Sequence, residues 1–243
     1  MTRLRIASIN IERSKHLHRV DAFLQTYKPD VLCLQELMRS DIAFFEDIMG
    51  NAMAFAPMLK GPSPDKEGLD DAQGVGIIGW GALTGVTRTY YHGTAAEAVE
   101  HHTGYGDNTT PNVLLAASYQ GFRIATTHLN VTVHGEATPS QQASAAKLVA
   151  AAQAESKAHD GLLLCGDFNA PRGRATFSLI SQAFEDGIPS HYTSSLDPDL
   201  HRAGPIPFMV DGLFHTPSYL LADAKLHTGI SDHCALTCTL SKR

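Results

Sequence analysis

Two short runs of nearly uninterrupted apolar residues limit the folds open to this chain more than any other feature. They are Asp30–Gln35 (DVLCLQ) and Gly161–Cys165 (GLLLC). Runs of this length and apolarity are typical of strands that are covered on both faces. Each run follows an expected helix: Arg13–Lys28 has an apolar stripe, and Ser140–His159 is Ala-rich with Ser140 as its N-cap. We therefore expect sheets that are covered by helices.

The rest of the chain supplies enough strands for stacked sheets. Further strands are expected at Arg3–Asn10, Gly74–Trp80, Val86–Tyr91, Asn112–Tyr119, Phe122–Leu129, Phe208–Phe214, Tyr219–Leu226 and Cys234–Leu240. Shorter helices are expected at Ser40–Met49 and Arg174–Ala183. Stretches that are polar or rich in Gly and Pro are expected to form rim loops at Pro57–Gln73, His92–Pro111 and Glu185–Pro207. Because no linker or low-complexity stretch interrupts the pattern, residues 1–243 are expected to form a single domain.

The charge balance argues against a protein that coats duplex nucleic acid. The chain carries 19 Lys and Arg against 25 Asp and Glu, a formal net charge of −6, whereas such proteins are usually basic. A nucleic-acid substrate stays open, because a bound divalent cation inverts the local field. No apolar run reaches about 18 residues, and the first residues lack the apolar core of a signal peptide. We expect a cytoplasmic monomer without a membrane span, and four free, buried cysteines.

Polar side chains stand at the ends of the expected strands or interrupt their apolar runs. The positions are Asn10, Gln35–Glu36, His128 with Asn130, Asp167 with Asn169, Asp211, and Ser231–Asp232–His233. Six such places indicate a common pocket. Single positions have structural alternatives: Asp167 could form an Asx turn, Glu36 could cap the following helix, and Asn10 could simply end its strand in a turn.

Three of these positions carry hard oxygen ligands. The carboxylates of Glu36 and Asp232, with the amide oxygen of Asn10, suit Mg²⁺ or Mn²⁺. In proteins these ions keep several waters and bind substrate phosphates. The set therefore predicts a divalent metal site.

The remaining positions suit phosphate chemistry. His128 and His233 are candidate donors to phosphate oxygens, and Asp211 could fix the tautomer of His233. Asp167 and Asn169 could orient a water or a departing oxygen. With a metal ion, these are the parts for attack of water on a phosphoester.

In this order, the motifs IASIN, LQE, THLN, GDFN, VDGLF and SDH resemble those of the endonuclease/exonuclease/phosphatase superfamily, which includes pancreatic deoxyribonuclease-like nucleases. The resemblance spans Asn10 to His233. It implies an α/β fold, a four-layer α/β/β/α sandwich of two mostly antiparallel sheets flanked by helices. It also implies that Asn10, Glu36 and Asp232 hold Mg²⁺ or Mn²⁺, and that Asp167 and Asn169 contact a second ion where two are bound.

The same resemblance implies the catalytic roles. The match to His128 contacts the scissile phosphate, and those to Asp167 and Asn169 position the nucleophile or stabilise the transition state. Asp211 and His233 match a carboxylate–imidazole pair.

One departure bears on the substrate. Many members carry an Arg three residues before a Gln on the helix after the catalytic His, whereas Thr138 and Pro139 precede Gln141 and Gln142 here. Contact between that helix and a DNA backbone is therefore not expected. We expect a metal-dependent phosphoester hydrolase, a phosphodiesterase or nuclease, with nucleic acid among its candidate substrates. A phosphomonoesterase, a phospholipid-headgroup hydrolase and a non-catalytic phosphate-binding module are the alternatives.

Overall fold

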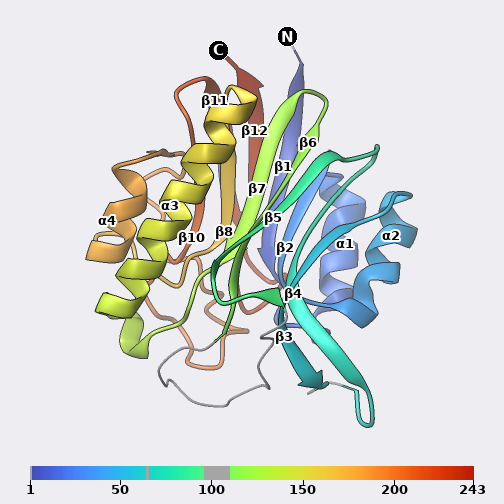
Figure 1. Ribbon diagram of the computed structural model, residues 1–243. Coiled ribbons are helices and arrows are strands. Elements are labelled where there is room, and N and C mark those ends of the chain that lie inside the picture. The colour runs from blue at the N-terminus through green and yellow to red at the C-terminus, as the bar shows by residue number, and fades with distance from the viewer. Residues whose placement is uncertain (1, 64–65, 96–109) are drawn as a thin grey trace.

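The computed structural model describes residues 2–63, 66–95 and 110–243, and two six-stranded sheets form its centre (Figure 1). The first sheet has the order β11 (Tyr219–His227), β12 (Ala235–Lys242), β1 (Arg3–Asn10), β2 (Val31–Met38), β4 (Asp70–Gly79) and β3 (Ala54–Pro62). β1 and β2 run parallel, and the other neighbouring strands run antiparallel.

The second sheet also has one parallel pair at its centre. Its order is β5 (Thr84–His92), β6 (Asn112–Tyr119), β7 (Phe122–His128), β8 (Leu163–Asp167), β10 (Asp211–His215) and β9 (Glu185–Asp186). β7 and β8 run parallel, and the other pairs run antiparallel.

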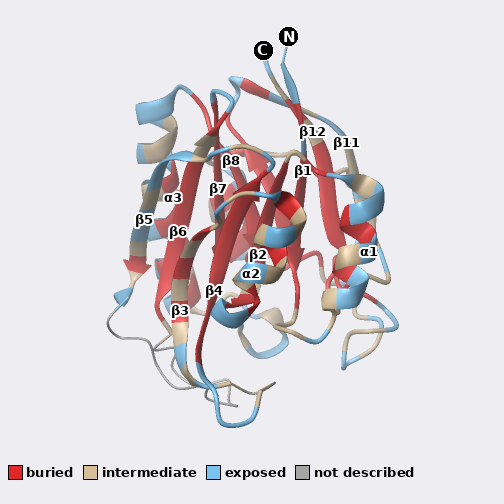
Figure 2. Cartoon of the chain, turned by 90° about the vertical axis from the view of Figure 1, so that its right-hand side faces the viewer, coloured by how far each residue is buried: buried red, intermediate tan, exposed pale blue. Residues whose placement is uncertain are grey.

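Helices cover the outer faces of both sheets (Figures 1 and 2). The first sheet is covered by α1 (Leu17–Tyr27) and α2 (Ile42–Met49), with the 3₁₀ turn η1 (Arg39–Asp41) between β2 and α2. The second is covered by α3 (Pro139–His159) and α4 (Ala175–Ser181), and η3 (Val133–Gly135) precedes α3. This arrangement confirms the expected four-layer sandwich. Within the described residues, every helix is too short or too polar to span a membrane.

Three apolar clusters hold the layers together. One lies between the sheets and includes Ile6, Val75 and Ile124, and the other two lie beneath α1 with α2 and beneath α3 with α4. β1, β2, β7 and β8 are buried along most of their lengths, as their apolar sequences predict. The four cysteines are buried and free, as expected.

The structure corrects some sequence expectations. Pro57–Gln73 is not a loop, because most of its described residues lie in the antiparallel strands β3 and β4. α3 is capped by Thr138, whose Oγ1 accepts a hydrogen bond from the Gln141 backbone N–H at 3.2 Å, and Ser140 lies inside the helix. Of the expected loop His92–Pro111, residues 96–109 lie outside the described residues.

The two parallel pairs, β1 with β2 and β7 with β8, determine where polar side chains from the strand ends come together. Parallel strands bring their carboxyl ends to the same edge of a sheet. β1 begins at the end of the molecule that holds both termini, so it ends at the opposite end (Figure 1). Asn10 ends β1, and Asp167 and His128 end β8 and β7.

Candidate active site

Asp167 joins the two sheets at this end of the sandwich. Its Oδ2 accepts a hydrogen bond from Asn10 Nδ2 at 3.0 Å, and the same amide nitrogen donates to Glu36 Oε1 at 3.3 Å. Its Oδ1 accepts from the Asn169 backbone N–H at 2.8 Å. Asp167 is 1% exposed, and a buried carboxylate requires such partners. One carboxylate therefore connects β1 with β8.

A glycine brings β7 close to β8. Gly166 has φ +143°, and a Cβ there would lie 2.1 Å from the backbone oxygen of Thr127. Only glycine allows this close approach of the two backbones. His128 consequently pairs in register with Asp167, and its Nε2 lies 3.4 Å from Asp167 Oδ2.

Asn169 holds the loop that follows β7. Its Nδ2 donates to the Leu129 backbone oxygen at 2.9 Å and lies 3.0 Å from His128 Nε2. Asn169 has φ +48°, a left-handed conformation that Asn tolerates better than most residues. The side chains of GDFN and THLN therefore form one hydrogen-bonded unit.

Glu36 enters the site from a strand bulge. The second strand does not end at Glu36, as the sequence suggested, but continues to Met38. The register between β2 and β4 shifts between Leu34 and Leu37, and Glu36 has φ +55°. A bulge re-aims a side chain at the cost of local pairing. Here it directs the carboxylate to Asn10 and to Gln73, whose Nε2 donates to Glu36 Oε2 at 3.1 Å.

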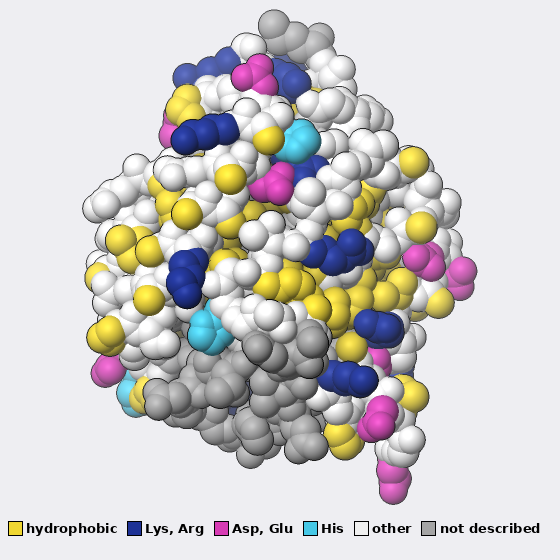
Figure 3. Space-filling view, viewed as in Figure 1, with side chains coloured by type: hydrophobic (Ala, Val, Ile, Leu, Met, Phe, Trp, Pro, Cys, Tyr) yellow, Lys and Arg dark blue, Asp and Glu magenta, His cyan; other side chains and the backbone are white. Residues whose placement is uncertain are grey.

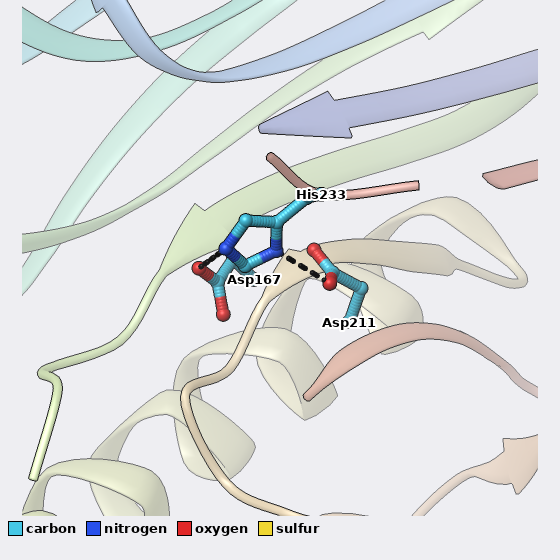
Figure 4. Close-up of side chains that lie close together, drawn as sticks. All are labelled: Asp167, Asp211 and His233. Atoms are coloured by element: carbon cyan, nitrogen blue, oxygen red, sulfur yellow. Dashed lines mark hydrogen bonds and ion pairs between the residues drawn. The ribbon is translucent and has the colours of Figure 1, made fainter. Parts of the chain in front are cut away.

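His233 lies between two carboxylates (Figure 4). Its Nδ1 donates to Asp211 Oδ2 at 2.8 Å, and its Nε2 lies 3.8 Å from Asp167 Oδ2. Burial lowers the pKa of His233, but the charges of Asp211 and Asp167 outweigh it and raise this pKa well above the ordinary value. Burial raises the pKa of Asp211, against the opposing effect of His233. The expected pairing of Asp211 with His233 is present in the structure.

Two separate groups of side chains are candidates for holding a cation. Ligand atoms of Asp167, Asp211 and His233 all lie within 4.8 Å of one another, so this group could hold a metal ion. The second group is the one expected from the sequence, Asn10, Glu36 and Asp232; Asn10 turns its amide nitrogen to Glu36, and its Oδ1 accepts the Glu12 backbone N–H at 3.1 Å. Burial and then the charges of Glu36 and Glu12 raise the pKa of Asp232 to about 6.

The second group suits a hard divalent ion better. Carboxylates that repel one another in a buried place are stabilised by a cation, and oxygen ligands suit Mg²⁺. In the first group, Nδ1 of His233 already donates to Asp211, and imidazole is not a preferred ligand of Mg²⁺. The carboxylates of Glu36 and Asp232 therefore have the chemistry that the expected metal requires.

The sequence reasoning missed several supporting side chains. Ser195 Oγ accepts from the backbone N–H groups of Val210 and Asp211, both at 3.0 Å. Gln141 Nε2 donates to the backbone oxygens of Asn130 and Asn169, at 2.8 and 3.0 Å. These residues position the loops that carry the site. The sequence points to Gln141 only through the Arg that is missing before it.

On the face shown in Figure 3, Lys and Arg side chains are spread out rather than gathered into one stripe. A stripe is the usual footprint of a protein that tracks a nucleic-acid backbone.

Comparisons with known proteins agree with this geometry. The model of the Endonuclease/Exonuclease/phosphatase family matches residues 7–233. A search of curated proteins found no significant match.

Solved structures match over the whole length. The human Nocturnin catalytic domain with bound sulfate is 18% identical, with a TM-score of 0.74 over 99% of this chain and 94% of that chain. A 3′ phosphatase from Neisseria bound to a product DNA hairpin is 18% identical, with a TM-score of 0.69 over 97% and 98%. A mannosyl-6-phosphatase from Bacteroides thetaiotaomicron is 12% identical, with a TM-score of 0.69 over 98% and 99%. At these identities the matches show a shared fold. The family model and the fold together show that this chain belongs to the endonuclease/exonuclease/phosphatase family.

Proposed function

We propose that this chain is a divalent-metal-dependent phosphodiesterase or nuclease in which water attacks phosphorus in line with the departing oxygen. The observation that carries the proposal is the position of His233, a buried imidazole between the carboxylates of Asp211 and Asp167. A buried histidine held in its charged form is a strong donor to a phosphate oxygen. The hydrogen bond to Asp211 keeps a proton on Nδ1 of His233. Nε2 of His233 is therefore the nitrogen that faces the phosphate.

The other side chains supply the remaining parts of the reaction. Asn10, Glu36 and Asp232 would hold Mg²⁺ or Mn²⁺, which when bound neutralises charge on the phosphate oxygens. His128 holds a non-bridging oxygen of the phosphate, and Asn169 keeps His128 in place. Asp167, held by Asn10 and the Asn169 backbone, orients the attacking water.

A substrate panel tests this proposal. Two solved structures of this fold are phosphatases by name, so the panel should contain monoesters as well as diesters. We would assay plasmid DNA, a DNA hairpin with a 3′ phosphate, bis-p-nitrophenyl phosphate, p-nitrophenyl phosphate, inositol phosphates and sphingomyelin. We expect hydrolysis of diesters with Mg²⁺ or Mn²⁺, loss of activity in EDTA and recovery when metal is restored. Preference for monoesters would change the class, and no hydrolysis of any substrate would favour a binding module.

Replacing one ligand tests the metal site separately. Glu36→Gln removes the charge and keeps the side-chain shape, so calorimetric titration should show weaker Mg²⁺ binding by about tenfold or more. His159→Ala, at the far end of α3, is the matched control. Equal Mg²⁺ affinity in wild type and Glu36→Gln would remove Glu36 from the metal site.

A further inference from the structure

A short loop beside the active site makes contacts that the proposed function does not use. The loop is Asp197–Gly204, in the long segment between β9 and β10. Leu196, directly before it, forms an isolated antiparallel bridge with His233. The loop therefore starts at the wall of the site.

Asp197 clamps this loop to the segment that carries Asp232. Its Oδ1 accepts hydrogen bonds from the backbone N–H groups of Asp199 and Leu200, at 3.0 and 2.9 Å. Its Oδ2 accepts from the Gly229 N–H at 2.6 Å, and its own N–H donates to the Asp232 backbone oxygen at 2.8 Å. Asp197 is 1% exposed. Because every one of these contacts involves the backbone, the clamp fixes the path of both segments.

The hydrogen bonds of Asp197 hold the Asp197–Gly204 loop on the side where a pocket, rather than packed side chains, lies next to it. A pocket of about 500 Å³ lies beside it, lined by Pro198 and Pro205 of the loop region and by Leu226 at the end of β11. A loop beside a pocket has fewer contacts with the core than a packed loop has. Losing the clamp should therefore affect the loop first.

The clamp brings His201 to the active site. The His201 backbone N–H donates to the Asp197 backbone oxygen at 3.1 Å. The His201 ring lies edge-on to the His233 ring, with centroids 6.4 Å apart and an interplanar angle of 76°. Nδ1 of His201 accepts from the Ala203 N–H at 3.3 Å, which places the ring proton on Nε2. Among the described residues, no hydrogen bond from this Nε2–H is present.

We propose that His201 contacts the substrate: its Nε2–H donates a hydrogen bond to an oxygen of the phosphoester, and Asp197 is the residue that positions it. The inference rests on the proposed function and adds a recognition group to the same site. Burial and the neighbouring charge of His233 lower the pKa of His201, so it acts as a neutral donor near pH 7. A neutral donor binds phosphate oxygens without competing with the cation for the carboxylates.

A binding experiment tests the contact without turnover. Inorganic phosphate is titrated into the Mg²⁺-loaded protein while the histidine ring signals are followed by NMR, with variants used for assignment. We expect saturable shifts for His201 and His233, and none for His159, which ends α3 beside Glu155. Shifts at His233 without His201 would overturn the inference and leave the proposed function standing. No shift at either histidine would count against both.

Kinetics test whether the contact matters for hydrolysis. His201→Ala should lower kcat/KM about 10- to 100-fold, the usual effect of losing one hydrogen bond to a charged group. His201→Gln keeps an N–H donor and should recover at least part of the loss. Asp197→Asn replaces one of the two accepting carboxylate oxygens with an NH₂ group and so weakens the clamp. It should lower kcat/KM by less than His201→Ala does. Adding it to His201→Ala should cost less than Asp197→Asn costs alone, because part of the effect of Asp197 passes through His201. A His201→Ala variant that folds normally and keeps kcat/KM within twofold of wild type would overturn the inference.

Discussion

The two ends of β7 each carry a basic side chain, and their surroundings differ. Near the start of the strand, the Arg123 guanidinium is fully buried and donates to Glu155 Oε2 at 2.9 and 2.6 Å, to Thr87 Oγ1 at 2.7 Å and to the Gly85 backbone oxygen at 2.7 Å. At the end of the strand, the His128 side chain is 18% exposed, and its Nε2 has Asn169 and Asp167 as neighbours.

The difference separates two uses of buried polar groups. The Arg123 network is closed, because side chains and backbone from β5, β6 and α3 use up its donors. The network around His128 and His233 is open to a ligand and contains Asp211 and Asp232, whose pKa values are raised by burial and by neighbouring carboxylates. A closed network stabilises the fold, whereas an open one keeps groups available for binding and chemistry. Four predictions test this distinction.

The largest effect is expected at the open end. Asp211→Asn and His233→Ala should each lower kcat by about 10² to 10⁴, the scale for a positioned acid–base group. Because the two residues form one hydrogen-bonded pair, the double variant should lose little more than the worse single variant. The measurement is a double-mutant cycle on kcat at saturating metal. Losses that multiply in full would mean that the two side chains act independently.

The closed end should respond in stability instead. Glu155→Ala leaves the buried Arg123 charge without its partner, so the free energy of unfolding should fall by about 3–5 kcal/mol. Replacing both residues with apolar ones, Arg123→Met with Glu155→Leu, should cost less than Glu155→Ala alone. Urea denaturation measures both, and kcat of the folded fraction should stay within a few-fold of wild type. A large loss of kcat in Glu155→Ala would break the comparison.

The pH dependence of stability should report the charges at the open end. Asp232 has a pKa of about 6 when folded against an ordinary 3.8, so between these values the folded state binds the extra proton. Without metal, this group's contribution therefore falls as pH rises from about 4 to about 6, by about 3 kcal/mol at 1.36 kcal/mol for each pKa unit. Asp232→Asn removes the titration.

Urea denaturation in EDTA at several pH values tests this. The stability of Asp232→Asn relative to wild type should increase through the same pH window, and saturating Mg²⁺ should cancel the gain. A difference that stays constant with pH would contradict the assignment.

The smallest effect on catalysis is expected for the cysteines. Cys33, Cys165 and Cys238 lie in the apolar cluster between the sheets, and Cys234 is buried as well. Replacing all four with Ala should reduce stability through small cavities. The kcat of the folded protein should stay within about twofold of wild type. A loss above tenfold in a variant with a normal circular dichroism spectrum would show that a thiol takes part.

The sequence predicted the strands and helices well because their signals are local. Arg3–Asn10 and Asn112–Tyr119 form strands with the expected bounds, since apolar runs and turn residues mark both. The bulge at Glu36 was missed because it depends on pairing with β4, which the sequence of β2 does not record. β3 and the first residues of β4 were missed because polar and Gly- and Pro-containing residues resemble a loop.

Most of the site residues could be chosen from the sequence, but their partners could not. The contact of Asn10 with Asp167 joins residues 157 positions apart, and no local pattern specifies such a pair. Asp197 and His201 lie in the stretch DPDLHRAG, which has no helical or strand period. Its one local signal is an Asp followed by Pro and Asp, which is typical of an Asx turn.

The pairing of β1 with β12 joins two distant parts of the chain in one sheet. Arg3 pairs with Ser241 and Leu4 with Leu240, so a nascent chain makes its first strand long before that strand's neighbour leaves the ribosome. Until then one edge of β1 can pair with other chains, a stage at which a chaperone would be useful. Asp232 and His233 are synthesised just before β12. The chain should therefore complete its set of site residues only as the first sheet closes, and partly made chains should be inert.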